Sequence, residues 1–576
     1  MSEYRFPSSE ERHQLLQELK ELEGSEGKEI SQTEVYQNYI MVMTGLDSEM
    51  ERLSKPLPDS SDDGMPAVNK TEKEMLLLLL QSAGRAGEAF LALAEADGEK
   101  NLRKGLAGVV NKLQGVLSRD FDVISSYDPE ENLSLSEIQE KSRTKSINLK
   151  SESLQKLEKM QNPRISMTVL DSRGNPKKGV FVKANYNHFK SDFNKMMENA
   201  AQKSSPEGQE EISKIMESFN DFLINKKSSD LTGESVTKRL QDDYLIGVFH
   251  RYLEHEYPPV EQPITQNEIK TFIGKVLDLR VDTISPESIK ALAKGFSKLK
   301  AESGIDICNC DLELKEGDRI DNRSTCMSAV AGLLGVSGLL AKSDNMICKD
   351  ENGNIIKGTF MDYGKGFDLN DNPALFMHVS SNPYKKMNSL MKQIADLQVV
   401  DLLCLNVDRN GGNLLYQVDE KGNIIGIQGI GNDTSFGNGS ITDDDIEKLN
   451  VMSKSMSEKL QGISKEMFKF VLRGRGLSDK EIDKAGDRLE LLKKAIKLKK
   501  IRVIDDNELG DYSFADFGSP SRKAPNTFDR INYFVMKSLK NYKKEGLNAK
   551  VTQKHSPDKQ KTAEGAKKEL SKEYGK

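Results

Sequence analysis

The 576-residue sequence predicts an α+β fold, and two observations support this prediction. First, three stretches alternate apolar or β-branched residues around turn-forming residues, as β-hairpins do: Arg164–Tyr186, Ala341–Gly366 and Leu414–Ile430. Second, segments with helical periodicity precede, separate and follow these stretches. The chain is therefore expected to combine helices with strand hairpins.

Composition limits the class of protein. Hydrophobic residues make up 36% of the chain and charged residues 30%, and the formal net charge is -6. A chain of this length corresponds to about three or four domains of roughly 150 residues each. The mean hydropathy of -0.59 indicates that much of the chain is exposed helix, loop or tail. The slightly acidic balance argues against nucleic acid as a partner, because bulk nucleic-acid binding normally needs a basic excess.

Cysteines and apolar runs indicate a cytoplasmic protein. The five cysteines are odd in number and lie mostly inside apolar runs, which favours reduced, buried thiols. The spacing of Cys308 and Cys310 is too tight for a zinc knuckle. The N-terminus lacks the pattern of a signal peptide. The apolar run Met75–Leu80 is too short for a transmembrane segment and is expected to belong to an amphipathic helix. Signal-free secretion as an effector stays open.

Residues 1–150 are predicted to form an all-helical N-terminal region, which is also a candidate surface for binding a partner. Three segments in it have helical character: Ser8–Leu22, Lys73–Ala96 and Asn101–Leu117. Ser8 and Glu11 have the spacing of a capping box. Pro56–Pro66 is rich in Pro, Ser and Asp and is predicted to be a linker. The polar, poorly patterned stretch 127–150 marks the boundary.

A long helical insertion separates the first two hairpins. Strands are predicted within 164–186 and 320–366, and the charged, mostly helical stretch 187–315 lies between them. Further helices are expected at Pro286–Lys300, Asn322–Leu334, Met387–Asn406 and Leu477–Lys497. The last of these begins with the capping-box pair Ser478 and Glu481. Residues 506–576 are predicted to be a C-terminal tail, disordered from about 540 because that part is Lys-rich and nearly free of apolar residues.

The stretch VDRNGGN (Val407–Asn413) has the spacing of a phosphoryl-transfer loop. Such a loop needs a carboxylate that orients the nucleophile and accepts its proton, and a side-chain oxygen that holds magnesium against the phosphates. Asp408 and Asn413 supply these groups five positions apart. A sharp turn without chemistry is the alternative, because the stretch is rich in turn formers.

The order of elements around this stretch favours the catalytic alternative. A helix, the loop, a hairpin and the polar motif GNDTSFG (Gly431–Gly437) follow one another, as in the C-terminal lobe of a kinase. Upstream, GVFVK ends a predicted strand with Lys183, the position of a phosphate-binding lysine. The helix Asn322–Leu334 and the strand end at Met361–Gly364 then fall where a kinase has its N-lobe helix and its interlobe hinge.

The stretches NVDRNGGNLLY, IQGIGNDTSFG and NRSTCMSAVAGLLGVSGLLAKS together resemble bacterial members of the atypical kinase group. This group shares its fold with phosphatidylinositol 3/4-kinases and HipA-like toxin kinases. The resemblance covers about Arg164–Gly437 and extends weakly to about 505. It implies a two-lobed protein-kinase-like domain over 156–505, whose N-lobe strands surround the helical insertion and whose C-lobe spans 367–505.

The resemblance also implies roles for individual residues, with ATP and Mg2+ as cofactors. Asp408 corresponds to the catalytic carboxylate, Arg409 to a structural or phosphate-facing partner, and Asn413 to a metal ligand. Lys183 corresponds to the phosphate-binding lysine. The nucleotide-binding residues at the hinge would be Met361, Asp362 and Tyr363, whose backbone would bind adenine.

The sequence departs from the family pattern at three places. Asn410 stands where many relatives have His, and Gly431 stands where the metal-binding Asp should be. Asp433 is the expected substitute metal ligand, since alternate residues of a strand point to the same side and a glycine permits a bulge. A glycine-rich loop is missing ahead of Arg164, as is often the case in atypical kinases.

The expected function is ATP-dependent phosphoryl transfer to a protein hydroxyl. A phosphoinositide is the less favoured acceptor, because the residues that follow Gly437 are acidic. Two alternatives stay open. In one, the loss of the metal-binding Asp makes the protein a pseudokinase or nucleotide-binding scaffold that works through protein–protein interaction. In the other, the same fold transfers the AMP part of ATP.

Overall fold

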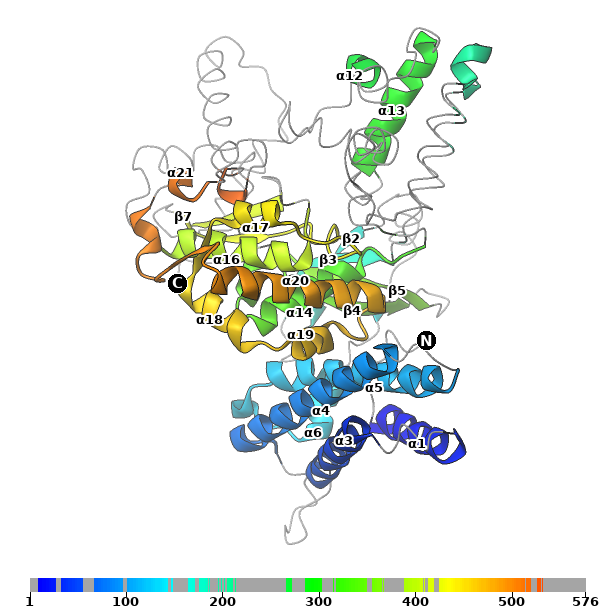
Figure 1. Ribbon diagram of the computed structural model, residues 1–576, viewed down its shortest axis with the longest axis vertical. Coiled ribbons are helices and arrows are strands. Elements are labelled where there is room, and N and C mark those ends of the chain that lie inside the picture. The colour runs from blue at the N-terminus through cyan, green and yellow to red at the C-terminus, as the bar shows by residue number, and fades with distance from the viewer. Residues whose placement is uncertain are drawn as a thin grey trace.

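The computed structural model describes most of the chain between Ser9 and Ile531 (Figure 1). The described ranges are 9–26, 33–54, 67–96, 101–142, 147–148, 164–170, 176–184, 266–271, 285–302, 317–349, 355–364, 388–407, 413–418, 424–512 and 514–518. Residues 186, 314, 366, 409, 526–529 and 531 and a few residues between 195 and 213 are also described. The sequence folds as a mixed α+β protein, as predicted.

Helices form the N-terminal part of the chain, as predicted, and we call it the N-terminal bundle. Its four long helices are α1 (Ser9–Glu26), α3 (Glu34–Leu53), α4 (Lys70–Ala96) and α5 (Asn101–Ser126). The short elements η2 (Pro129–Glu131) and α6 (Leu135–Ser142) complete it. Side chains such as Leu46, Leu80 and Leu113 are fully buried between the helices. The Ser8 side of the predicted capping box lies outside the described residues.

A five-stranded sheet follows, and we call it, together with α14, the sheet body. Its strands are β1 (Ile147–Asn148), β2 (Arg164–Leu170), β3 (Pro176–Lys183), β4 (Ser343–Lys349) and β5 (Ile355–Asp362), in the order β1-β4-β5-β3-β2. The predicted hairpins β2–β3 and β4–β5 are both antiparallel. Phe181 faces Phe360 across the β3–β5 pair and forms a small core with Met346 and Cys348. Strand β1 pairs in parallel with β4 and lies within residues 1–150, so the prediction that this whole region is helical is wrong at its end.

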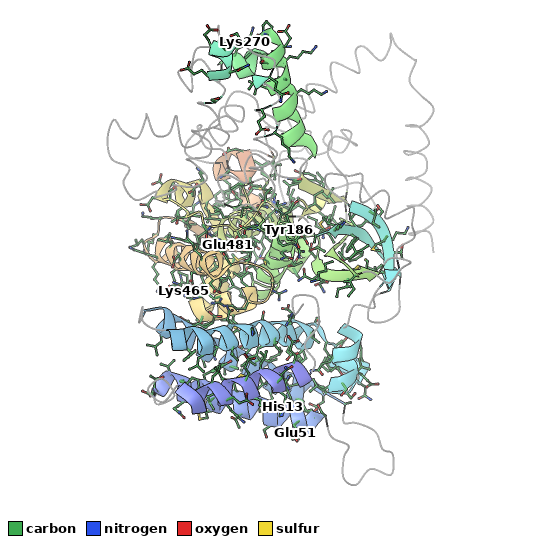
Figure 2. The ribbon with its side chains drawn as sticks, turned by 90° about the vertical axis from the view of Figure 1, so that its right-hand side faces the viewer. His13, Glu51, Tyr186, Lys270, Lys465 and Glu481 are labelled. Carbon is green, nitrogen blue, oxygen red and sulfur yellow. The ribbon has the colours of Figure 1, made fainter. Side chains whose placement is uncertain are left out.

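Helix α14 (Asn322–Leu333) packs on β4 and β5, and η7 (Ser337–Leu339) leads from it to β4. In the predicted insertion 187–315, the structure describes two longer helices, α12 (Gln266–Thr271) and α13 (Pro286–Glu302). Figures 1 and 2 show these two helices at the end of the molecule opposite the N-terminal bundle.

The remaining elements form the helical body around the buried helix α16 (Asn388–Cys404). Its small sheets pair β6 (Leu414–Val418) with β7 (Ile424–Gly429), and β8 (Val451–Ser453) with β9 (Arg502–Ile504). Its other elements are α17 (Asp443–Leu449), α18 (Lys454–Gly462), α19 (Lys465–Leu472), α20 (Asp479–Lys497), η9 (Leu509–Asp511) and α21 (Phe514–Phe517). Ser478 and Glu481 make the predicted capping box of α20.

The packed body extends beyond residue 505, where the C-terminal tail was predicted to begin. Phe514, Phe517, Phe528 and Ile531 are almost completely buried and belong to the main hydrophobic core. Phe514 and Phe517 both pack on Phe528. The prediction missed this because it was made from the average composition of the tail, which is rich in Lys. The stretch predicted to be disordered from about 540 lies outside the described residues.

Helix α4 is long and apolar enough to cross a membrane, and in the described part of the chain it is the one such helix. It packs against α3, α5 and α19. Leu76, Leu80 and Phe90 face the core, whereas Met75 and Leu78 are exposed. This burial pattern is the one expected for an amphipathic helix of a bundle.

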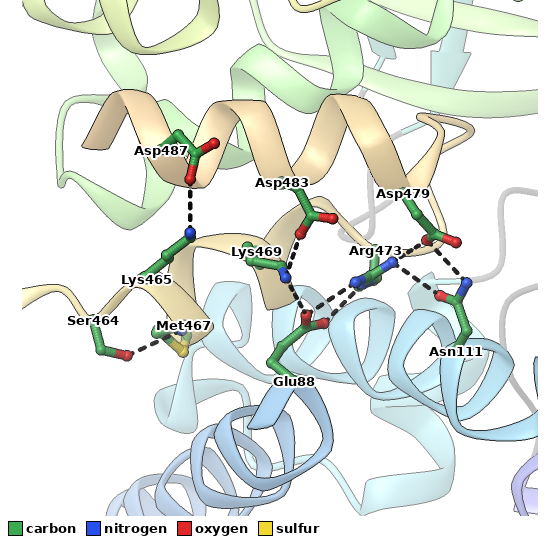
Figure 3. Close-up of polar contacts among 10 residues, drawn as sticks. All are labelled: Glu88, Asn111, Ser464, Lys465, Met467, Lys469, Arg473, Asp479, Asp483 and Asp487. Carbon is green, nitrogen blue, oxygen red and sulfur yellow. Dashed lines mark hydrogen bonds and ion pairs between the residues drawn. The ribbon is translucent and has the colours of Figure 1, made fainter. Parts of the chain in front are cut away.

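A buried ionic network joins the N-terminal bundle to the helical body (Figure 3). Glu88 of α4 accepts two hydrogen bonds from Arg473, at 2.8 and 3.0 Å, and lies 3.7 Å from the ammonium group of Lys469. The side chain of Glu88 is completely buried, and the ring of Phe470 packs directly on Gly84 one turn earlier in α4. Arg473 also pairs with Asp479 at the start of α20. The bundle is therefore part of one continuous core and not a tethered domain.

We expect Glu88→Ala to lower the free energy of unfolding by about 3 kcal/mol, because Arg473 and Lys469 lose the completely buried carboxylate between them. Arg473 keeps its pair with Asp479 and Lys469 its pair with Asp483, but both of these carboxylates are more exposed than Glu88. Urea unfolding followed by circular dichroism measures this change. Glu49→Ala is the matched control, since Glu49 pairs with the exposed Arg52 on the outside of α3. Its effect should be about 0.5 kcal/mol or less. Equal effects of the two substitutions would show that the network does not hold the bundle.

Candidate functional site

The two motif-bearing stretches lie side by side at the end of α16. The loop 405–413 runs from α16 to β6, the hairpin β6–β7 returns, and residues 430–437 follow β7. The amide of Phe436 donates to the carbonyl of Cys404 at 2.5 Å, and the amide of Val407 donates to Thr434 at 3.3 Å. The order helix, loop, hairpin and polar motif is as predicted. We call residues 405–413 and 430–437 the loop cluster.

Arg409 is the buried centre of the loop cluster, with 2% of its surface exposed. Its Nε and Nη2 atoms donate to the carboxylate of Asp401 in α16, at 3.0 and 2.9 Å. This two-pronged arrangement is the strong geometry for an arginine–carboxylate pair. The loop is thereby fixed to the last turn of α16.

The same guanidinium group holds the second half of the loop cluster. Nη1 donates to the carbonyls of Asn413 and Ile430, at 3.1 and 2.7 Å, and Nη2 donates to Oδ1 of Asn432 at 2.7 Å. All three nitrogens of Arg409 are therefore occupied by protein acceptors. Of its two predicted roles, this geometry favours the structural one over contact with phosphate.

A second layer of hydrogen bonds surrounds Arg409. Asn406 donates from Nδ2 to Asp401 at 3.1 Å and accepts from the hydroxyl of Thr434 at 3.4 Å. Ser435 donates to the carbonyl of Asn432 at 2.8 Å. Because Asp401, Asn432 and Ser435 are buried, these bonds replace water as the partners of the polar groups.

Two residues of the loop cluster have strained backbone. Leu405 and Phe436 have φ values of 50° and 63°, which are unusual for residues with a side chain of this size. Such a conformation costs about 1 to 2 kcal/mol per residue and persists only where the surroundings impose it. Here the Phe436–Cys404 hydrogen bond and the complete burial of the Phe436 ring impose it. Strain of this kind is typical of functional sites.

Burial also changes the chemistry of two groups below the loop cluster. It raises the pKa of the Cys404 thiol well above its ordinary value, so this cysteine stays protonated. It lowers the pKa of Arg488 to about 10, which still leaves the guanidinium charged at neutral pH. Arg488 donates to the carbonyls of Leu403 and Gly439, at 2.8 and 2.9 Å. Both groups therefore support the loops and are poor candidates for nucleophile or base.

The chain changes direction at Gly431, two residues before Asp433, the expected substitute metal ligand. Strand β7 ends at Gly429, and Gly431 has a φ of +63°. The expectation that Asp433 follows strand alternation is therefore wrong, although a glycine-dependent change of backbone direction does occur. A Cβ atom at position 431 would lie 2.6 Å from Oδ1 of Asn413, so the Asn413 side chain occupies the space of the missing side chain.

The oxygen groups of Asn413 and Asp433 fit a magnesium ion in chemical type. Mg2+ prefers oxygen ligands and is commonly bound by one or two carboxylates together with substrate phosphates. Asn413 presents its amide oxygen at Gly431, and Asp433 follows two residues later, half-buried. Among the described residues, no group of three His, Cys, Asp or Glu side chains gathers around a metal position. Asp408, the predicted catalytic carboxylate, lies outside the described residues.

Lys183 lies at the end of β3, half-buried and opposite Gly358 of β5. Its predicted position on a strand end is confirmed, and its role with phosphate stays a prediction. Helix α14 contains no acidic residue that could pair with it. Asp321, just before that helix, already binds Arg319 and accepts from Thr359 at 2.9 Å.

The predicted adenine-binding residues Met361, Asp362 and Tyr363 lie at the end of a central strand. The amide of Asp362 donates to the carbonyl of Lys342 at 2.9 Å, and that of Tyr363 donates to Lys178 at 3.2 Å. Met361 is in register with strands on both sides. The N–H groups of Asp362 and Tyr363 therefore donate within the sheet, and a role of these three residues in binding adenine stays a prediction.

Three structural residues of the site were missed from the sequence: Asp401, Asn432 and Glu481. Asp401 had a signal, because it is an acidic residue inside the apolar run VVDLLCL and such a residue needs a buried partner. Asn432 stands inside the polar motif without any pattern that marks it. Glu481 was predicted as a capping residue only, although its carboxylate also accepts from the amide of Gly437 at 3.1 Å.

No protein-family model matches the chain. No curated protein matches it either.

We expect Arg409→Lys to lower the free energy of unfolding by about 3 kcal/mol, because a lysine cannot reproduce the fork that joins Asp401 to Asn432. Urea unfolding monitored by circular dichroism measures the loss. Arg52→Lys is the control, since Arg52 is exposed in its pair with Glu49. If the two substitutions cost the same, Arg409 does not organise the loops.

Restoring the family residue at position 431 should harm the protein. Gly431→Asp would place a side chain on a residue with positive φ, which costs about 1 to 2 kcal/mol, and would push against Asn413. Gly431→Ala carries the same penalty without the carboxylate and separates backbone strain from charge. Thermal unfolding is the measurement. A Gly431→Asp variant as stable as the wild type would contradict the contact with Asn413.

Proposed function

We propose that the protein is an ATP-dependent phosphotransferase of the atypical kinase type, with a two-lobed kinase-like domain made of the sheet body and the helical body. The acceptor is a hydroxyl group. Its oxygen bonds to the γ-phosphorus of ATP, and the bond from that phosphorus to the bridging oxygen breaks. ADP leaves, and the proton of the hydroxyl passes to the carboxylate of Asp408.

The observation that supports this proposal most is the way Arg409 joins the two motifs. One guanidinium group brings the loop with the Asp408–Asn413 spacing against the segment that carries Asp433. A turn without chemistry would not need a buried arginine fixed on both sides, nor the strained residues Leu405 and Phe436. Rigid loops of this kind suit phosphoryl transfer, because this reaction depends on positioning and charge more than on covalent chemistry.

Each predicted site residue has a defined role in the proposed reaction. Asp408 orients the acceptor hydroxyl and takes its proton. Asn413 and Asp433 would hold magnesium, which when bound supplies positive charge against the phosphate oxygens. Lys183 would bind the phosphates from the sheet body. Arg409 touches no substrate and acts by fixing the loop that carries Asp408.

A protein hydroxyl is the proposed acceptor. The helix that follows the loop cluster, α17, begins with acidic residues, and the side chain of Asp443 is 76% exposed. Lys500 and Lys448 pair with Asp443 and Asp445, so these cations are already occupied by carboxylates and offer little attraction to an anionic phosphoinositide headgroup. We place the protein in the cytoplasm, where ATP is abundant. The described cysteines Cys326, Cys348 and Cys404 support this, because all three are buried free thiols.

A nucleotide-binding scaffold, or pseudokinase, is the second candidate. It is favoured by Gly431, because the Asn413 side chain occupies the space that a metal-binding Asp would need. In this case the loop cluster binds nucleotide weakly or without metal, and the N-terminal bundle or the helices of the insertion bind a partner. Transfer of AMP through the same fold is the third outcome of the experiment below.

A thermal-shift titration with ATP, with and without magnesium, tests the proposal on the wild type, Asp408→Asn and Asp433→Asn. At ATP about 100 times its Kd, the wild type should gain about 2.7 kcal/mol of stability. Asp433→Asn should lose the magnesium-dependent part of this gain. Asp408→Asn should still bind, and its transfer rate should fall by about 100-fold or more.

Label transfer separates the candidates. Transfer of label from γ-labelled ATP to a protein supports the kinase, whereas transfer from α-labelled ATP supports AMP transfer. Nucleotide binding without magnesium and without transfer of either label supports the scaffold and contradicts the kinase. Asp443→Asn is the control for a charge change outside the loop cluster and should leave binding unchanged.

A further inference from the structure

We propose that Glu481 is a positioning residue that holds the segment Ser435–Gly437 in place and links it to α14. This inference rests on the proposed function for its meaning, because the held segment follows Asp433 directly. Figure 2 shows Glu481 near the middle of the molecule, between the N-terminal bundle and the α12–α13 end. The side chain is 5% exposed, so its partners are protein groups.

One oxygen of Glu481 completes the start of α20. Oε2 accepts from the backbone amide of Ser478 at 2.8 Å and from its hydroxyl at 2.9 Å. The Ser478 hydroxyl in turn accepts from the amide of Glu481 at 3.3 Å. This reciprocal pair is a capping box, and a glutamine serves in it as well as a glutamate.

The other oxygen has no part in the cap. Oε1 accepts from the amide of Gly437, at 3.1 Å, and from the guanidinium of Arg323 in the first turn of α14. Arg323 is 1% exposed and also donates to the carbonyl of Arg319. One buried carboxylate therefore joins α20, the end of the loop cluster and the helix that packs on the sheet body.

The surrounding contacts make this junction rigid. The Asn322 side chain of α14 lies directly on Gly476, two residues before Ser478. Arg473 and Asp479 of the same junction belong to the network that holds the N-terminal bundle. A displacement of α14 or of the bundle must therefore act on the helix start that carries Glu481.

Both oxygens are needed at once, which defines the requirement for a carboxylate. A glutamine has one accepting oxygen and one donating NH2 group. If its oxygen completes the cap, the NH2 group faces two donors, the Gly437 amide and Arg323. The held segment contains a strained residue, Phe436, whose φ is 63°, so the segment is expected to move once the bond to Gly437 is lost.

Hydrogen–deuterium exchange of the full chain, without nucleotide, tests the proposal on Glu481→Gln. The amides of 435–439 should exchange about tenfold faster or more, as expected for loss of a hydrogen bond to a buried charge. Ser478→Ala is the matched control, because it removes the cap hydroxyl and leaves Oε1 with Gly437 and Arg323. It should change exchange at the start of α20 but not in 435–439.

A second variant covers the case in which Glu481→Gln does not fold. Arg323→Lys keeps the positive charge but cannot donate to Glu481 and to the Arg319 carbonyl through two separate nitrogens. It should speed exchange in 435–439 by a smaller factor than Glu481→Gln. Unchanged exchange in 435–439 in both variants, or equal acceleration in Ser478→Ala, overturns the proposal.

The nucleotide arm separates this proposal from the proposed function. Magnesium-dependent stabilisation by ATP is measured on the wild type, Glu481→Gln and Ser478→Ala. Faster exchange in Glu481→Gln together with weaker stabilisation supports both proposals. Faster exchange in Glu481→Gln, together with a wild type that ATP does not stabilise, supports the positioning role and contradicts the kinase. ATP binding by the wild type with unchanged exchange in the variants contradicts the positioning role alone.

Discussion

A guanidinium group is costly to bury unless its nitrogens find acceptors, and the nitrogens of Arg409 find them in three different segments. Asp401 lies in α16, Asn413 at the start of β6, and Asn432 after β7. Without the Asp401 carboxylate the charge would be costly to bury, and without the charge the Ile430 carbonyl and Oδ1 of Asn432 would each lose a donor. The strained backbone of the loop cluster and the position of Gly431 are therefore possible only because this one pair is complete.

Buried ion pairs also join the larger parts of the molecule. Glu88 and Glu481 are each a buried carboxylate that meets cations from another part of the chain. Glu88 receives Arg473 and Lys469, and Glu481 receives Arg323. The N-terminal bundle, α14 and the loop cluster therefore converge on the short stretch between α19 and α20. A ligand or partner that moved any of them would meet resistance at this point.

The sequence was sufficient for the local structure and insufficient for contacts between distant segments. Hairpins and the α20 capping box were predicted correctly, because alternation and capping are patterns of neighbouring residues. The core role of Asp401, Asn432 and Glu481 was not predicted, because each is fixed by a partner at least eight positions away. The use of the Asp362 and Tyr363 N–H groups within the sheet was also not predicted, because the sequence does not reveal that β5 is flanked on both sides.

The ion pair between Glu88 and Arg473 has a consequence for folding during synthesis on the ribosome. These residues are 385 positions apart, so the bundle leaves the ribosome long before its partner exists. At about 5 to 20 residues per second, the delay is about 20 to 80 seconds. During that time the α4 surface around Gly84 is not yet covered by the Phe470 ring. Biogenesis of this protein therefore includes a period in which a nascent apolar surface needs protection, for example by a chaperone.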